Sequence, residues 1–154
     1  MNRIPHEPPW AEWRFVQDVV PTDENRWIHL HNLAIAELLF DARNLYVAER
    51  VGISWDGLRE AGRTLVLRRL EIDFEQEVPS GTALKVGVRA VTRTRRTVTF
   101  DEAVWRVDPP TAVALARSVH LVVRRDRPGA IELPEDIAGR FEHFEGRPLR
   151  WPAT

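Results

Sequence analysis

The sequence contains no cysteine, a single methionine and a single tyrosine among its 154 residues. The absence of cysteine excludes a disulfide scaffold, a thiolate metal site and a cysteine nucleophile. No apolar run approaches the roughly 18 residues that a membrane span needs. The first thirty residues also lack a basic start followed by an apolar segment, which a secretory signal would show. We therefore expect a cytoplasmic protein with no membrane partner.

Neither positive nor negative charge predominates in the sequence. The 22 basic side chains nearly balance the 23 acidic ones, and the net charge of -1 provides no electrostatic footprint for nucleic acid. Hydrophobic residues make up 44% of the chain, which is typical of a soluble globular protein. The length favours a single domain over residues 1–154, with a proline-containing N-terminal arm at 1–11 and a C-terminal tail at 146–154.

One long helix is the clearest predicted element. Residues 32–51 are rich in Leu, Ala and Glu, contain neither Gly nor Pro, and are followed by Gly52, a residue typical of helix ends. Asn32 is a suitable N-cap. Apolar residues surround the helix almost completely, so we expect it to be buried on most sides. A polar stripe of Glu37, Asp41 and Asn44 interrupts them, and it either faces solvent or lines a cleft.

Alternating apolar and polar residues predict five strands, at 12–20, 64–78, 83–91, 97–107 and 114–125. We expect an α+β fold in which a five-stranded antiparallel sheet wraps around the central helix. The four later strands are predicted to form a meander, with residues 79–82 as a hairpin turn. One small sheet leaves strand edges exposed, which favours a homo-oligomer whose sheets join edge to edge.

The segment before the central helix holds the candidate catalytic carboxylate. Asp23 would lie near the positive end of the helix dipole, where free backbone N–H groups can bind a carbonyl oxygen that gains negative charge. Asp23 either caps a turn or attacks an acyl group, directly or through water. His29 and His31 point the same way in an extended segment, but no third ligand has suitable spacing, so we expect no metal site.

Three arginines and one further histidine have two readings each. Arg93, Arg95 and Arg96 alternate with threonine, which is typical of a solvated hairpin, although arginines so arranged can also clamp phosphate. His120 lies within an apolar strand, and this position favours a core or interface histidine over a catalyst.

The order of several short segments resembles the hotdog-fold acyl-CoA thioesterases of the 4-hydroxybenzoyl-CoA thioesterase type. Residues 23–33 are similar to that family's catalytic loop, with Asp first and an Asn-plus-apolar pair at the helix start. Residues 40–43 resemble an acidic, Ala-Arg-containing segment of the family's helix. Further similar stretches are residues 51–54, 62–66, 72–74 and 78–82. Together they cover nearly all of the chain.

This resemblance implies a thioester hydrolase in which Asp23 is the nucleophile or general base. The backbone N–H groups around His31, Asn32 and Leu33 would polarise the thioester carbonyl. The substrate-binding residues that it implies are Trp27, His29, Leu33, Glu37, Asp41, Arg93, Arg95 and Arg96, with the arginines on CoA phosphates. The substrate would be a thioester of CoA or acyl carrier protein, no cofactor would be needed, and the site would form between subunits of a dimer or tetramer.

Two other functions remain open at this point. Asp23, Asn25 and His29 resemble the Asp-x-Asn-Pro-x-His motif of hotdog enoyl-CoA hydratases, although the spacing is one residue longer and the proline is missing. The chain is also compatible with a non-catalytic hotdog dimer that binds acyl groups. Replacement of Asp23 discriminates, because an enzyme loses turnover while a binding protein does not.

Overall fold

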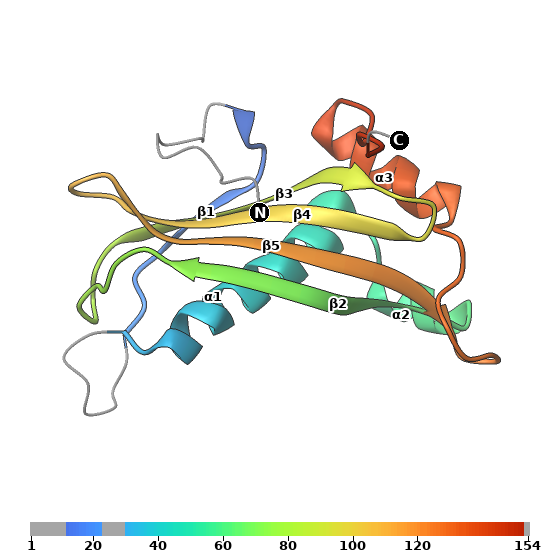
Figure 1. Ribbon diagram of the computed structural model, residues 1–154, viewed down its shortest axis with the longest axis horizontal. Helices are drawn as coiled ribbons and strands as arrows, with labels where there is room; N and C mark the ends of the chain where they lie inside the picture. The colour runs from blue at the N-terminus through green and yellow to red at the C-terminus, as the bar shows by residue number, and fades with distance from the viewer. Residues whose placement is uncertain (1–11, 23–29, 153–154) are drawn as a thin grey trace.

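The computed structural model describes residues 12–22 and 30–152. A five-stranded antiparallel sheet curves around helix α1, and the two shorter helices α2 and α3 lie toward one end (Figure 1). The elements are β1 (Val16–Val19), α1 (Asn32–Leu45), the π-helical η2 (Tyr46–Val51), α2 (Trp55–Glu60), β2 (Arg63–Phe74), β3 (Leu84–Arg93), β4 (Thr97–Arg106), β5 (Thr111–Arg124) and α3 (Glu135–Glu145). The predicted α+β hotdog fold is therefore confirmed.

Helix α1 continues directly into η2, and the two end at Gly52 in the left-handed conformation with φ 85°. The predicted helix over residues 32–51 is thus confirmed. Its N-cap is wrong by one residue, since Asn32 is the first helical residue and His31 is the cap. The reason is that the His31 ring reaches the backbone, where Nδ1 accepts a hydrogen bond from Leu33 N at 3.1 Å. None of the described helices has the length and apolarity needed to cross a membrane.

The strand order β1-β3-β4-β5-β2 contradicts the predicted meander. Strand β2 pairs with β5 along its whole length, so β2 and β3 are separated by two strands. Residues 79–82 do form a turn, but it belongs to a crossing segment and not to a hairpin. That segment is held by Leu30 N, which donates to Val78 O at 2.8 Å, and by Gly81 N, which donates to Pro21 O at 2.9 Å. The alternation of apolar and polar residues shows which face of a strand is buried, but it does not show which other strand lies beside it in the sheet.

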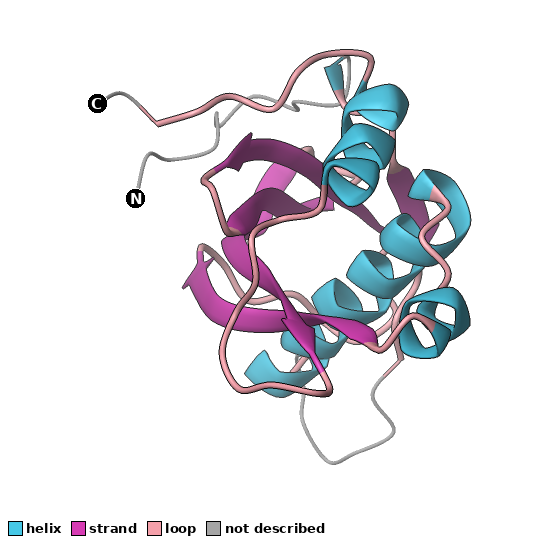
Figure 2. Cartoon of the chain, turned by 90° about the vertical axis from the view of Figure 1, so that its right-hand side faces the viewer, coloured by secondary structure: helices cyan, strands magenta, loops and turns pink. Residues whose placement is uncertain are grey.

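The main core lies between α1 and the concave face of the sheet (Figure 2). Ile35, Leu39 and Ala42 of α1 are buried against it. The opposite side of the helix is not covered, since Leu33 is 72% and Phe40 55% exposed. The expectation that α1 is buried on most sides is therefore wrong for the single chain, because one sheet covers only one side of a helix.

Candidate active site

A cavity of about 270 Å³ lies at the amino end of α1, between the helix start and the segment that follows β2. Leu30, Asn32 and Ile35 line it on the helix side, and residues 74–78 line it on the other. The segment is fixed there because Glu75 N donates to Val113 O at 2.9 Å and Gln76 Nε2 donates to Ala112 O at 2.8 Å. The start of the helix thus lies against this cavity.

The backbone of α1 provides hydrogen-bond donors at this end. The Leu33 N–H is occupied by the His31 ring. The N–H groups of Asn32 and Ala34 make no hydrogen bond with residues in the described ranges. Two donors and the positive end of the helix dipole can therefore act on an oxygen atom that carries partial negative charge. Of the three predicted amide donors, the structure assigns Leu33 to the cap.

Asp23, Trp27 and His29 lie outside the described residues, so the position of the predicted catalytic carboxylate comes from the sequence alone. The other predicted residues of α1 are placed. Leu33, Glu37 and Asp41 are exposed on the helix. The polar stripe thus divides: Glu37 and Asp41 face outward from the single chain, whereas Asn44 is half-buried and lines a second cavity.

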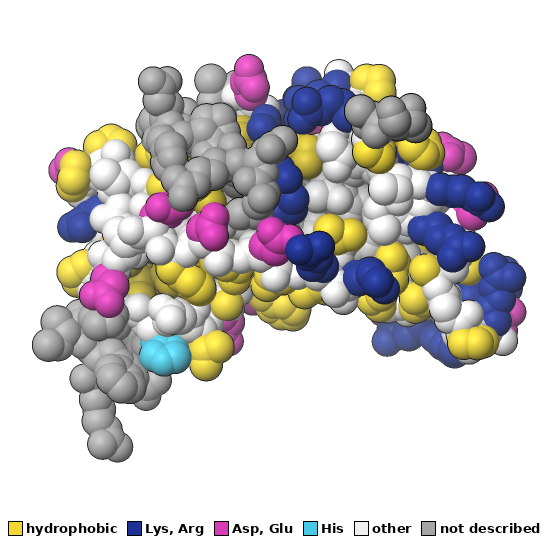
Figure 3. Space-filling view, viewed as in Figure 1, with side chains coloured by type: hydrophobic (Ala, Val, Ile, Leu, Met, Phe, Trp, Pro, Cys, Tyr) yellow, Lys and Arg dark blue, Asp and Glu magenta, His cyan; other side chains and the backbone are white. Residues whose placement is uncertain are grey.

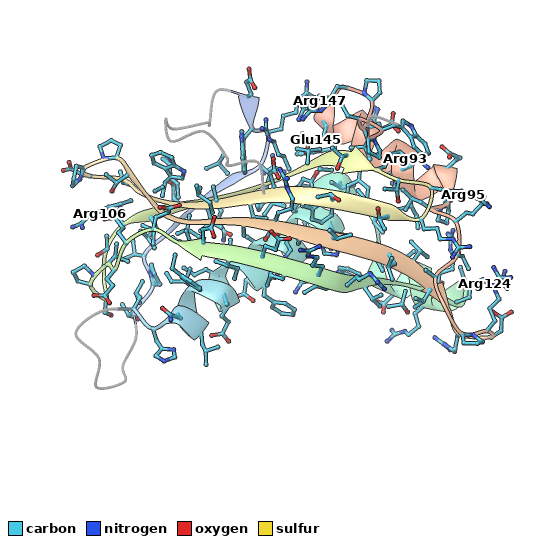
Figure 4. The ribbon with its side chains drawn as sticks, viewed as in Figure 1. Arg93, Arg95, Arg106, Arg124, Glu145 and Arg147 are labelled. Carbon is cyan, nitrogen blue, oxygen red and sulfur yellow. The ribbon has the colours of Figure 1, made fainter. Side chains whose placement is uncertain are left out.

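Arg93 and Arg95, two of the three predicted phosphate-binding arginines, lie at the opposite end of the sheet from the start of α1 (Figure 4). Arg93 is 5% exposed, pairs with Glu135 at 3.2 Å and lies over the Trp151 ring. It holds the start of α3 and the C-terminal segment against the sheet. Arg95 is exposed and pairs with Glu132 at 2.6 Å, and Arg96 is exposed. Of the three arginines, only Arg95 and Arg96 are open to a ligand.

The second cavity, of about 120 Å³, lies beside the middle of the continuous α1–η2 helix and is lined by residues that include Arg43 and His120. His120 is buried, and its Nε2 lies 2.9 Å from Ser118 Oγ, so the prediction of a core histidine is confirmed. Glu102 of the neighbouring strand is fully buried and was missed by sequence reasoning. The signal was present: both Glu102 and His120 occupy apolar positions of an alternating strand.

Burial shifts the pKa values of Glu102 and His120. It raises the pKa of Glu102 to about 7, against the smaller lowering effects of Arg43 and the Ser118 hydroxyl. Burial, together with the nearby Arg43, lowers the pKa of His120 to about 3, so the ring is neutral at physiological pH. Within residues 12–22 and 30–152, no three histidine, aspartate or glutamate side chains gather as metal ligands would.

Comparison with known proteins gives a consistent result. A family model described as the thioesterase-like superfamily matches residues 19–141. The search of curated proteins finds no match. A thioesterase from Thermus thermophilus, solved with coenzyme A and Zn, is similar at 26% identity and a TM-score of 0.73, over 90% of this chain and 98% of that chain.

Two further solved structures share the fold. A hypothetical protein from Staphylococcus aureus, solved in complex with CoA, has 15% identity and a TM-score of 0.77, over 90% of this chain and 89% of that chain. A 1,4-dihydroxy-2-naphthoyl-CoA thioesterase from Synechocystis has 15% identity and a TM-score of 0.73, over 82% of this chain and 94% of that chain.

Proposed function

Because the chain belongs to the thioesterase-like superfamily, we propose that it hydrolyses an acyl-CoA thioester to the free acid and CoA. The cavity at the amino end of α1 is the observation that carries this proposal. It lies against the start of α1, where the N–H groups of Asn32 and Ala34 make no hydrogen bond within the described ranges, and a thioester carbonyl placed there would gain stabilisation as its oxygen becomes negative. Asp23 is the proposed carboxylate of this site.

The reaction follows from these groups. The thioester oxygen accepts hydrogen bonds from the N–H groups of Asn32 and Ala34. Asp23 either attacks the carbonyl carbon or removes a proton from a water molecule that attacks it. The carbon–sulfur bond of the tetrahedral intermediate then breaks, and the thiolate leaves and takes up a proton. In the nucleophilic route, water afterwards hydrolyses the acyl-aspartate anhydride. Neither route requires a metal or a redox cofactor.

A second copy of the chain completes the proposed site. Within one chain, Arg95, with Arg96 next to it in the sequence, lies at the far end of the sheet from the start of α1 (Figure 4). Strand β2 forms one edge of the sheet and has no further strand neighbour among the described residues. Antiparallel pairing of β2 with its copy about a two-fold axis would set the arginine end of one sheet beside the α1 start of the other.

Exposed apolar side chains support this pairing. Figure 3 shows hydrophobic side chains along the side of the molecule that carries β2 and α1. Phe40, Leu67 and Phe74 are 55%, 45% and 48% exposed, respectively. A long edge strand whose outer side has no strand neighbour among the described residues, flanked by such side chains, is typical of an interface. We propose a homo-oligomer built on this edge, with the arginines of one subunit holding the phosphates of CoA bound at the other.

Thiol release from a panel of acyl-CoA substrates tests the proposal. We expect turnover of at least one substrate, and we expect Asp23→Asn to lower kcat by roughly 100- to 10,000-fold. Asp18→Asn is the matched control, because Asp18 is an exposed aspartate of β1 paired with Lys85. Equal activity of Asp23→Asn and the unaltered protein would contradict the role of Asp23. No thiol release from any substrate would contradict the proposed activity, and hydration of enoyl-CoA would then be measured.

A further inference from the structure

Three polar side chains interrupt the apolar face of the sheet that packs against α1. The buried residues of β4 on this face are Val98, Phe100 and Val104, with Glu102 among them. On the adjacent strand β5, Ser118 and His120 are likewise buried. A core position that carries a charged or polar group costs folding free energy unless the group is paired. These positions therefore require an explanation beyond packing.

Arg43 of α1 reaches into this polar group. It is 6% exposed, and its Nε lies 3.2 Å from Glu102 Oε1. The same Nε donates its hydrogen to Leu39 O at 3.3 Å, so the contact with Glu102 is an ion pair and not a hydrogen bond. The terminal nitrogens of the guanidinium donate no hydrogen bond to any residue that the structure describes. The N–H donors on both of these nitrogens are thus without a hydrogen-bonded acceptor.

Those donors belong to a side chain that lines the cavity beside the middle of the continuous α1–η2 helix. Asn44 and His120 add polar groups to its wall, while Phe40, Trp55 and Leu67 are among its apolar residues. The His120 ring is held through Nε2 by Ser118, and its Nδ1 has no hydrogen-bond partner in the described part of the chain. A volume of about 120 Å³ is too small for a CoA moiety but accommodates the end of an acyl chain.

We propose that this cavity binds a carboxylate at the far end of the acyl group, with the Arg43 guanidinium as its partner. This inference rests on the proposed thioesterase function and specifies its substrate class: acyl-CoA thioesters of dicarboxylic acids. Arg43 follows Asn32 by eleven residues, so the two lie roughly 16 Å apart along the helix axis. The cavity and the helix start can therefore hold two ends of one ligand.

The charges around Arg43 favour a carboxylate. A guanidinium offers paired N–H donors that match the two oxygens of a carboxylate, and Arg43 is itself buried, which strengthens the interaction. Glu102 now neutralises Arg43 without a well-directed hydrogen bond. Since burial raises the pKa of Glu102 to about 7, the protein can hold this residue neutral while the ligand replaces it as the counter-charge.

Matched pairs of acyl-CoA substrates test the inference. In each pair the chain length is equal and the chain ends in either a carboxylate or a methyl group. We expect kcat/KM to be roughly 10- to 100-fold higher for the carboxylate-ended member at the preferred length. The double variant Arg43→Gln with Glu102→Gln removes both charges together, and we expect it to lose this preference. Glu102→Gln alone keeps Arg43 and should retain it.

A binding measurement separates this inference from the proposed activity. Hexanoate and hexan-1-ol are titrated calorimetrically into the folded protein and into the double variant. Hexanoate should bind more tightly than the alcohol, and the double variant should lose that difference. If no thioester is hydrolysed but this Arg43-dependent binding is found, the proposed activity fails and the carboxylate site stands.

Four results would overturn the inference. The first is equal kcat/KM for carboxylate-ended and methyl-ended substrates in the unaltered protein. The second is a preference that persists in a double variant shown by thermal melting to be folded. The third is hexanoate binding that does not depend on Arg43. The fourth is a higher kcat/KM for hydroxyl-ended substrates than for carboxylate-ended ones. This result would mean that the cavity binds a neutral terminal oxygen and not a carboxylate.

Discussion

The two cavities along α1 present different kinds of polar groups, backbone N–H groups in one and side chains in the other. The cavity at the amino end uses main-chain N–H groups, which any helix start provides, and a segment fixed by backbone hydrogen bonds. The cavity beside the middle of the continuous α1–η2 helix is lined by side chains from several elements, among them Arg43 of α1, Leu67 of β2 and His120 of β5, which meet only when the helix packs on the sheet. Backbone donors suit the carbonyl common to all thioesters, whereas side chains can select one acyl group. Reaction and selectivity are thus separated along one helix.

The largest expected effect concerns stability at the middle of the helix. Arg43→Ala leaves Glu102 buried without its counter-charge, and we expect a loss of about 3–5 kcal/mol in the free energy of unfolding. Replacing both residues with methionine removes both charges and should cost less than Arg43→Ala alone. Urea unfolding measures both. A cost below about 1 kcal/mol for Arg43→Ala would show that the ion pair does not hold this region.

A dependence on pH sharpens the same contrast. The pKa of Glu102 is raised from 4.5 in the unfolded chain to about 7 by burial, so its protonated form favours folding. Its contribution is fully present below pH 4.5 and is lost as the pH rises through 7, on the order of 3 kcal/mol in all.

The variant Glu102→Gln isolates this contribution, because His120 titrates in an overlapping range with the opposite sign. Both proteins keep His120, Arg43, Ser118 and Asp101, so the difference between their unfolding free energies reports Glu102. We subtract the free energy of unfolding of Glu102→Gln from that of the unaltered protein. We expect this difference to fall as the pH rises from the unfolded pKa of Glu102, 4.5, to above its folded pKa of about 7. A difference that is constant across this range would mean that Glu102 does not titrate as proposed.

A smaller effect is expected at the proposed subunit interface. Leu67→Lys places a charge on edge strand β2, beside the cavity, and should weaken self-association by about 2 kcal/mol, roughly 30-fold. Light scattering across a concentration series measures this. Val20→Lys is the control, since Val20 is 62% exposed and follows strand β1 at the other edge of the sheet. If Val20→Lys dissociates the oligomer and Leu67→Lys does not, the interface lies at the β1 edge, which would contradict the proposed β2 interface.

The smallest effect concerns the start of the helix. His31→Ala removes the side chain that accepts from Leu33 N, and we expect a loss of about 1 kcal/mol in the free energy of unfolding. His31→Asn, which supplies another capping oxygen, should restore most of it. Thermal unfolding of the two variants measures the difference. Equal stability of His31→Ala and His31→Asn would show that the ring does not cap the helix.

Features that depend on local sequence were predicted well. The helix over 32–51 ends at Gly52 as expected. The strands from β2 to β5 lie close to their predicted positions. These elements follow from periodicity and from capping residues, which act within a few positions of the chain.

Features that depend on distant partners were not predictable in this way. The pairing of β2 with β5 joins Arg63 to Arg124, and nothing near either residue specifies the other. Arg93 is held by Glu135 of α3, so its burial could not be read from the basic turn that follows it. The contact of Arg43 with Glu102 also joins residues far apart in sequence. In each case, the deciding interaction forms only when the sheet has closed around the helix.

A crystal structure of Asp23→Asn with an unhydrolysed, carboxylate-ended acyl-CoA would test the account most directly. We predict that the thioester oxygen lies within hydrogen-bond distance of the Asn32 or Ala34 N–H, and that the terminal carboxylate contacts the Arg43 guanidinium. A thioester bound away from the amino end of α1, with the cavity beside Arg43 filled only by water, would contradict the account.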